Sequence, residues 1–112
     1  MKLIHLAAVA ALTLPLLASA QGRVVGAGTI TCAKYTNSRS VFDKPTILMV
    51  TTWTQGYMTA MNLVRVNSQQ PELKPVDQEQ IETYTKKYCA EHPLNMTYQA
   101  AQALVNDLAP SH

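Results

Sequence analysis

The chain contains two cysteines, Cys32 and Cys89, and a disulfide bond between them would restrict the folds that the chain can adopt. A disulfide between them would close a loop of about half the sequence, for which the chain-entropy treatment gives a stabilisation of about 4 kcal/mol. A small domain is stable by only roughly 5–10 kcal/mol, so this bond would decide whether the chain folds. Two free thiols or a metal-bound pair are the alternative, although no cluster of Cys or His accompanies either position.

The N-terminus favours the disulfide, because disulfides persist outside the cytoplasm and residues 1–20 have the features of a secretory signal peptide. Lys2 is basic, residues 3–17 form an apolar run, and Ala18-Ser19-Ala20 is a small-residue cleavage site. A transmembrane anchor is the alternative, but a span needs about 20 apolar residues, and this run is shorter and interrupted by a proline. We therefore expect cleavage before Gln21 and delivery to the bacterial periplasm or the medium, without membrane insertion.

Residues 21–112 would then form a single small domain, and their composition argues against several classes of function. The full chain has 9 basic and 7 acidic residues. This balance, with no basic cluster longer than Lys86-Lys87, argues against nucleic-acid binding. The sequence has no nucleophile motif, no paired catalytic carboxylates and no metal-ligand spacing, so we expect neither an enzyme nor a cofactor. His92, just before Pro93, is in a place where a histidine usually interacts with a helix end.

The spacing of the apolar residues predicts an all-α domain of four helices. The first would begin at Thr31, a good N-cap, and end near Ser40, after a Gly-rich extended arm at residues 21–30. The second would have Pro45 in its first turn. Gly56 disfavours that helix by about 1 kcal/mol, and we expect the close approach of another helix to explain it. The wide apolar face of the second helix would include Ile47, Val50, Trp53, Tyr57, Met61 and Val64.

A polar loop at residues 67–76 would separate the second helix from the third. Asp77 and Gln80 have the spacing of a capping box, which marks the start of the third helix. The fourth would begin at Leu94 or Met96. The buried sides of these two helices would be Ile81, Tyr84, Tyr88 and Cys89, and Ala100, Ala101, Leu104, Val105 and Leu108.

Several of these residues together resemble the pattern of known exported proteins. They are Gly26-Ala27-Gly28, Thr31-Cys32 with Tyr35, Trp53 with Gly56 and Tyr57, Tyr88-Cys89 with His92-Pro93-Leu94, and Ala100-Ala101 with Leu104 and Leu108. The pattern resembles that of the periplasmic HdeA/HdeB acid-stress chaperones. It is equally similar to the Rap/Tai immunity proteins, which neutralise peptidoglycan amidases delivered by type VI secretion. The residues expected in the core or on a partner face are Tyr35, Trp53, Gly56, Tyr57, Tyr88 and Leu104.

Resemblance to the chaperones implies a disulfide-stapled helical fold that binds other proteins. The chaperones are homodimers at neutral pH, and on acidification they open and hold unfolded clients on apolar surface. Protonation of carboxylates that are paired in the native state would drive such a switch, and this chain has only 7 acidic residues. Resemblance to the immunity proteins implies a tight complex with a toxin effector, in which the loop at residues 67–76 would plug the cleft of the enzyme.

Overall fold

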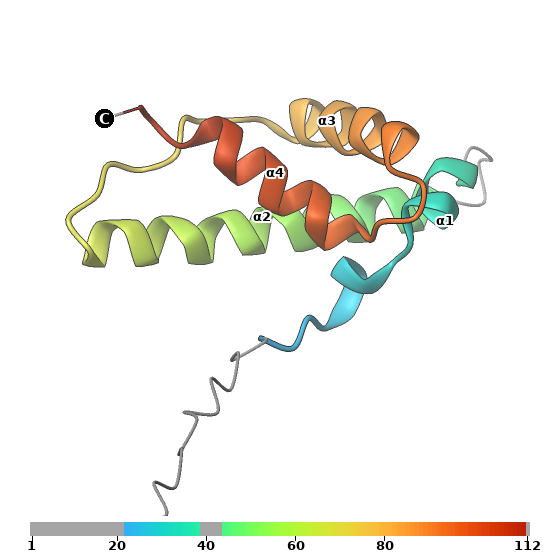
Figure 1. Ribbon diagram of the computed structural model, residues 1–112, viewed down its shortest axis with the longest axis horizontal. Helices are drawn as coiled ribbons and strands as arrows, with labels where there is room; N and C mark the ends of the chain where they lie inside the picture. Colours follow the sequence, from blue (N-terminus) through green and yellow to red (C-terminus); the bar gives the residue numbers. More distant parts are fainter. Residues whose placement is uncertain (1–21, 39–43, 112) are drawn as a thin grey trace, which may run out of the picture.

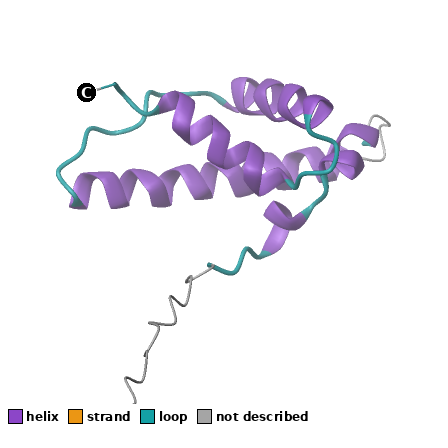
Figure 2. Cartoon of the chain, viewed as in Figure 1, coloured by secondary structure: helices purple, strands orange, loops and turns teal. Residues whose placement is uncertain are grey.

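The computed structural model describes residues 22–38 and 44–111, and this part of the chain is helical (Figure 2). The predicted signal peptide and the predicted helix end near Ser40 lie outside the described residues. None of the described helices is long and apolar enough to cross a bilayer. The elements in chain order are the short 3-10 helix η1 (Gly26–Thr29), α1 (Cys32–Asn37), α2 (Lys44–Asn67), α3 (Gln78–Glu91) and α4 (Thr97–Leu108).

The long helix α2 forms one layer of the molecule, and α3 and α4 lie together over one side of it (Figure 1). The helix α1 packs against α3, while η1 contacts both α2 and α4. The all-α prediction is therefore confirmed. The prediction of an extended arm at residues 21–30 is wrong at residues 26–29, where the chain forms η1.

Local capping explains where the helices begin and end. The Oγ1 of Thr31 accepts a hydrogen bond from the N–H of Lys34 at 3.2 Å, so the predicted N-cap of α1 is confirmed. The predicted capping box of α3 is also confirmed, since Asp77 Oδ1 accepts from the N–H of Gln80 and Gln80 Oε1 accepts from the N–H of Asp77. These contacts satisfy backbone donors that a helix start leaves without an intrahelical partner.

The buried face of α2 agrees with most of the predicted stripe, since Ile47, Val50, Trp53, Tyr57 and Met61 lie in the core or pack against it. Val50 is fully buried, but Val64, predicted to be on the same face, is 57% exposed. Thr51 and Thr54 are buried instead. Each donates its hydroxyl to the carbonyl four residues earlier, at 2.9 Å in both cases, and such a bond satisfies a buried hydroxyl within the helix itself. Apolar spacing therefore placed most of the buried face correctly, but it missed the two threonines and misplaced Val64.

The core has two parts, which lie along the length of α2. One surrounds the disulfide and contains Ala27, Cys32, Tyr35, Val50 and Cys89. The other lies where α3 and α4 cover the second half of α2, and it contains Met58, Leu73, Ile81, Leu104 and Val105. The first part fixes η1 and α1, and the second fixes the loop between α2 and α3.

Candidate functional site

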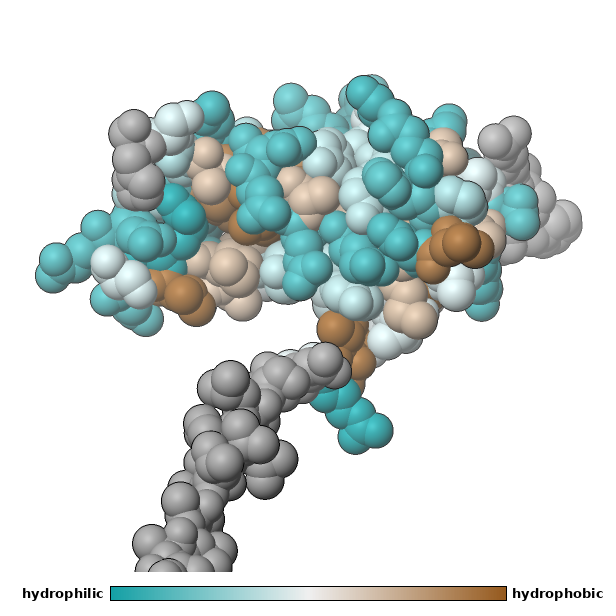
Figure 3. All heavy atoms as spheres, in the orientation of Figure 1, coloured by the Kyte–Doolittle hydropathy of each residue, from teal (hydrophilic) through white to brown (hydrophobic). Residues whose placement is uncertain are grey.

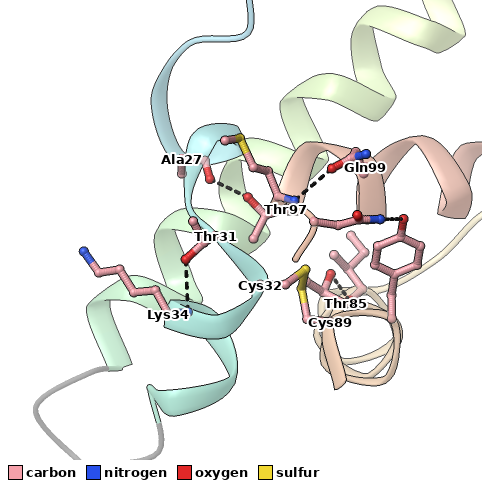
Figure 4. The surroundings of a disulfide bond; sticks show 12 residues. Ala27, Thr31, Cys32, Lys34, Thr85, Cys89, Thr97 and Gln99 are labelled. Atoms are coloured by element: carbon pink, nitrogen blue, oxygen red, sulfur yellow. Dashed lines mark hydrogen bonds between the residues drawn. A yellow bond between two sulfur atoms is a disulfide. The ribbon is translucent and has the colours of Figure 1, made fainter. Parts of the chain in front are cut away.

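The predicted disulfide between Cys32 and Cys89 is confirmed. It joins the first turn of α1 to the last turns of α3, with Cα atoms 4.6 Å apart and both cysteines fully buried (Figure 4). The described part of the chain has no free cysteine. It also has no group of three or more His, Cys, Asp or Glu side chains that could hold a metal ion. The alternatives of free thiols and a metal-bound pair are therefore wrong.

Hydrogen bonds reinforce the attachment that the disulfide makes. The N–H of Cys32 donates to the carbonyl of Asn95 at 2.8 Å, and the N–H of Thr97 donates to the carbonyl of Ile30 at 2.9 Å. The buried Oγ1 of Thr97 donates to the carbonyl of Ala27 at 2.7 Å (Figure 4). Segments about 70 positions apart in the sequence are thus fixed together at the start of α4.

The tyrosines near the disulfide and Leu104 on α4 are structural. Tyr35 is 5% exposed in the core part around the disulfide, and burial raises its pKa to about 12. The hydroxyl of Tyr88 accepts from Asn95 Nδ2 at 2.8 Å, and its ring lies 4.4 Å from that of His92. Leu104 is 4% exposed in the other part of the core.

Trp53 attaches η1 to α2. Its Nε1 donates to the carbonyl of Val25 at 2.8 Å, and its ring stacks on that of Tyr57 with centroids 5.6 Å apart. A Cβ atom on Gly28 would lie 2.6 Å from Cη2 of Trp53, so only glycine lets η1 come this close. Gly26 has a φ of 73°, in the left-handed region that favours glycine.

The expectation for Gly56 is wrong. This residue is exposed, and a Cβ atom built on it would meet nothing within 4 Å. No helix of the described chain approaches α2 there. The close approach predicted for Gly56 takes place at Gly28 instead, between η1 and the ring of Trp53.

Most of the exposed large apolar side chains of the described residues lie on α2. We call the centre line of its exposed side the outer face: Met49, Thr52, Gly56, Ala60 and Leu63, all exposed. Met49 is 55% exposed and Leu63 is 62% exposed. Residues 45–64 contain no charged side chain. Large apolar side chains also flank this line, namely Leu48, Val64 and Val66.

The space-filling view agrees with this distribution. Hydrophilic residues gather over α3 and α4, whereas white, tan and brown residues are frequent along the lower edge, where α2 runs (Figure 3). Exposed groups of large apolar side chains often mark a site of protein or membrane interaction. The outer face is therefore the candidate binding surface.

The loop between α2 and α3 is held in one conformation. The N–H of Leu73 donates to Asn62 Oδ1 at 2.9 Å, and Arg65 Nε donates to the carbonyl of Pro71 at 2.6 Å. The N–H of Lys74 donates to the carbonyl of Leu108, also at 2.9 Å, and Leu73 is 6% exposed. An open hollow of about 460 Å³ lies between this loop and α2. The sequence predicted only a polar loop and missed the buried leucine.

Comparison with protein-family models, with curated proteins and with solved structures gave no match. The resemblances to the HdeA/HdeB chaperones and to the Rap/Tai immunity proteins therefore stay predictions.

Proposed function

We propose that this protein is an exported binding protein of the chaperone type, similar in role to HdeA/HdeB. It would hold apolar segments of client proteins under envelope or acid stress. The observation that carries the proposal is the outer face of α2, an exposed line without charge that carries the large apolar side chains Met49 and Leu63 toward its two ends. The disulfide is compatible with an oxidising compartment, and cleavage after residue 20 would release the domain there.

The chemistry of the outer face fits an unfolded client. Burial of apolar surface contributes about 25 cal/mol per Å², and a face without charges adds no desolvation penalty for buried ions. Met49 is unbranched and flexible, so it adapts to side chains of different shape. Gly56 and Ala60 leave a shallow centre between the larger residues at either end. Such a surface binds apolar segments without demanding one sequence.

The stability of the fold does not depend on the outer face, so this face is available for binding. The core residues of α2 point toward α3 and α4, and the disulfide fixes the other elements. A charge placed on the outer face should therefore change binding without unfolding the domain. Since residues 45–64 contain no ionisable side chain apart from Tyr57, we expect the face to remain uncharged from acid to neutral pH.

Suppression of aggregation tests the proposal. Light scattering of a denatured client would be followed at neutral pH and at about pH 2–3. In this acid range, protonation of carboxylates destabilises the folded state of the client. The wild type should suppress scattering, and Leu63→Asp should lose most of this effect. Leu94→Asp is the matched control, because Leu94 is 98% exposed but lies between α3 and α4. Absence of suppression by the wild type at every pH would refute the proposal.

A second function, immunity against a type VI amidase effector, is favoured by the loop between α2 and α3. Its three anchoring hydrogen bonds keep the loop ordered before binding, and preorganisation lowers the entropic penalty of a tight complex. Co-expression with candidate peptidoglycan amidases tests this function. Asn62→Ala removes the hydrogen bond that holds Leu73. If this variant no longer protects cells while Leu63→Asp still does, the immunity function replaces the chaperone proposal.

A further inference from the structure

An open hollow of about 460 Å³ lies between α2 and the loop that leads from it to α3, drawn in yellow in Figure 1. Its volume is in the range of about 300–1,000 Å³ that is usual for small-molecule sites. Three of its lining residues, Met58, Leu73 and Ile81, are buried and form an apolar floor. The loop also lines it with exposed Glu72 and Lys74. The hollow therefore combines an apolar floor with charged groups of both signs.

One side of α2 contributes neutral polar side chains to the hollow. Gln55, Thr59 and Asn62 line it and are spaced by four and three residues, so they lie on the same side of the helix. The Oδ1 of Asn62 accepts from the N–H of Leu73 at 2.9 Å, and this bond fixes the orientation of the carboxamide. A side-chain amide also has two N–H donors. The Nδ2 of Asn62 therefore offers oriented donors to an acceptor in the hollow.

The hollow is formed before any ligand binds. Pro71 and Pro75 bracket this part of the loop, and proline fixes the backbone angle φ. The carbonyl of Pro71 accepts from Arg65 Nε, and Leu73 belongs to the core between α2, α3 and α4. A ligand would not have to order the loop, and such preorganisation lowers the entropic penalty of binding.

The backbone of the loop argues against an extended peptide as the ligand. A peptide that adds as a strand binds through main-chain hydrogen bonds along an edge. The N–H of Leu73 already donates to Asn62, and the N–H of Lys74 donates to the carbonyl of Leu108. Pro75 has no N–H. Three consecutive positions therefore offer no donor, and the side chains have to recognise the ligand.

We infer that the hollow binds a small zwitterion, a free amino acid with an apolar side chain. In this arrangement the ammonium group of Lys74 pairs with the carboxylate of the ligand, and Asn62 Nδ2 donates to the same carboxylate. The carboxylate of Glu72, two residues from Lys74 on the same loop, accepts from the ammonium group of the ligand. The apolar side chain of the ligand contacts the floor at Met58 and Ile81.

The exposure of the two charged side chains sets the expected affinity. Exposed ion pairs contribute little, and a ligand of about ten heavy atoms in an open hollow binds with a Kd on the order of 1 mM. Selectivity then comes from the requirement for both charges and the apolar side chain together. The site shares no residue with the outer face, so it does not depend on client holding.

NMR titration of the isotope-labelled, disulfide-bonded protein tests the site with three probes. L-leucine has both charges and an apolar side chain, glycine lacks the side chain, and N-acetyl-L-leucine amide lacks both charges. We expect leucine to shift the side-chain amide resonances of Asn62 and Gln55 saturably, with a Kd at least about fivefold lower than that of either other probe. Absence of saturable shifts with leucine, or equal affinity for all three probes, would overturn the proposal.

Substitutions of the two charged residues are the second test. Glu72→Gln and Lys74→Met change exposed side chains and keep the backbone hydrogen bonds of the loop. Each should weaken leucine binding about threefold, and the double variant about tenfold. Lys86→Met, which removes an exposed charge on α3 outside the hollow, is the matched control and should leave the Kd unchanged. Equal weakening by Lys74→Met and Lys86→Met, or no effect of the double variant, would refute the assignment.

Discussion

The two glycines Gly28 and Gly56 should respond to the same substitution in opposite directions. Gly28→Ala places a methyl group inside the ring of Trp53, 2.6 Å from Cη2 and 2.7 Å from Cε2. Insertion of a methyl into a packed site destabilises by about 1–3 kcal/mol. If the ring moves, its hydrogen bond to Val25 is lost as well, which adds about 1 kcal/mol. We expect a total loss of about 2–4 kcal/mol.

Gly56→Ala is the matched control. Its added methyl group enters open space, and alanine is favoured over glycine in a helix by about 1 kcal/mol. We therefore expect this variant to be more stable than the wild type, with a Tm about 4–8 °C higher for a domain of this size. Gly28→Ala should lower the Tm by at least about 8 °C on the same scale.

Thermal unfolding followed by far-UV circular dichroism measures both changes. It should be done at two protein concentrations, so that self-association does not contribute to the difference. Trp53 is the only tryptophan of the chain, so its fluorescence reports directly on whether the ring has moved in Gly28→Ala. A double-mutant cycle with Trp53→Leu isolates the contact. If Gly28→Ala destabilises the Trp53→Leu background as much as the wild type, the steric argument is wrong.

Further predictions concern the disulfide, a buried hydroxyl and two tyrosines. Cys89→Ala should lower the free energy of unfolding by about 4 kcal/mol, and denaturant curves equal to those of the oxidised wild type would contradict it. Thr97→Val leaves a buried carbonyl without its donor and should lower the free energy of unfolding by about 1–3 kcal/mol. The control Thr59→Val, at an exposed hydroxyl, should change it by less than about 0.5 kcal/mol. Equal effects of the two substitutions would contradict the prediction. Burial raises the pKa of Tyr35 and Tyr84 from 10.0 to about 12, so the folded state retains these protons longer than the unfolded state. The stability that these two tyrosines contribute is complete below pH 10 and is lost as the pH rises toward 12. Ultraviolet titration in which all tyrosines of the folded protein ionise near pH 10 would contradict this prediction.

Features that depend on nearby residues could be read from the sequence. The N-cap Thr31 and the capping box of Asp77 and Gln80 each act over a few positions, and the structure has both. The helical period of α2 is likewise local. The disulfide is a long-range contact, but it could be predicted because the chain has only two cysteines and so allows one pairing.

Features that depend on distant segments needed the tertiary structure. The close approach predicted at Gly56 occurs at Gly28 instead, because Trp53 reaches Gly28 from another element and no local pattern reports such a contact. Thr97 is buried because its hydroxyl finds the carbonyl of Ala27, and apolar spacing carries no signal for such a bond. The exposure of Leu63 likewise follows from which side of α2 the helices α3 and α4 cover. Local rules specify that a helix forms, whereas burial and binding surface depend on how the helices pack.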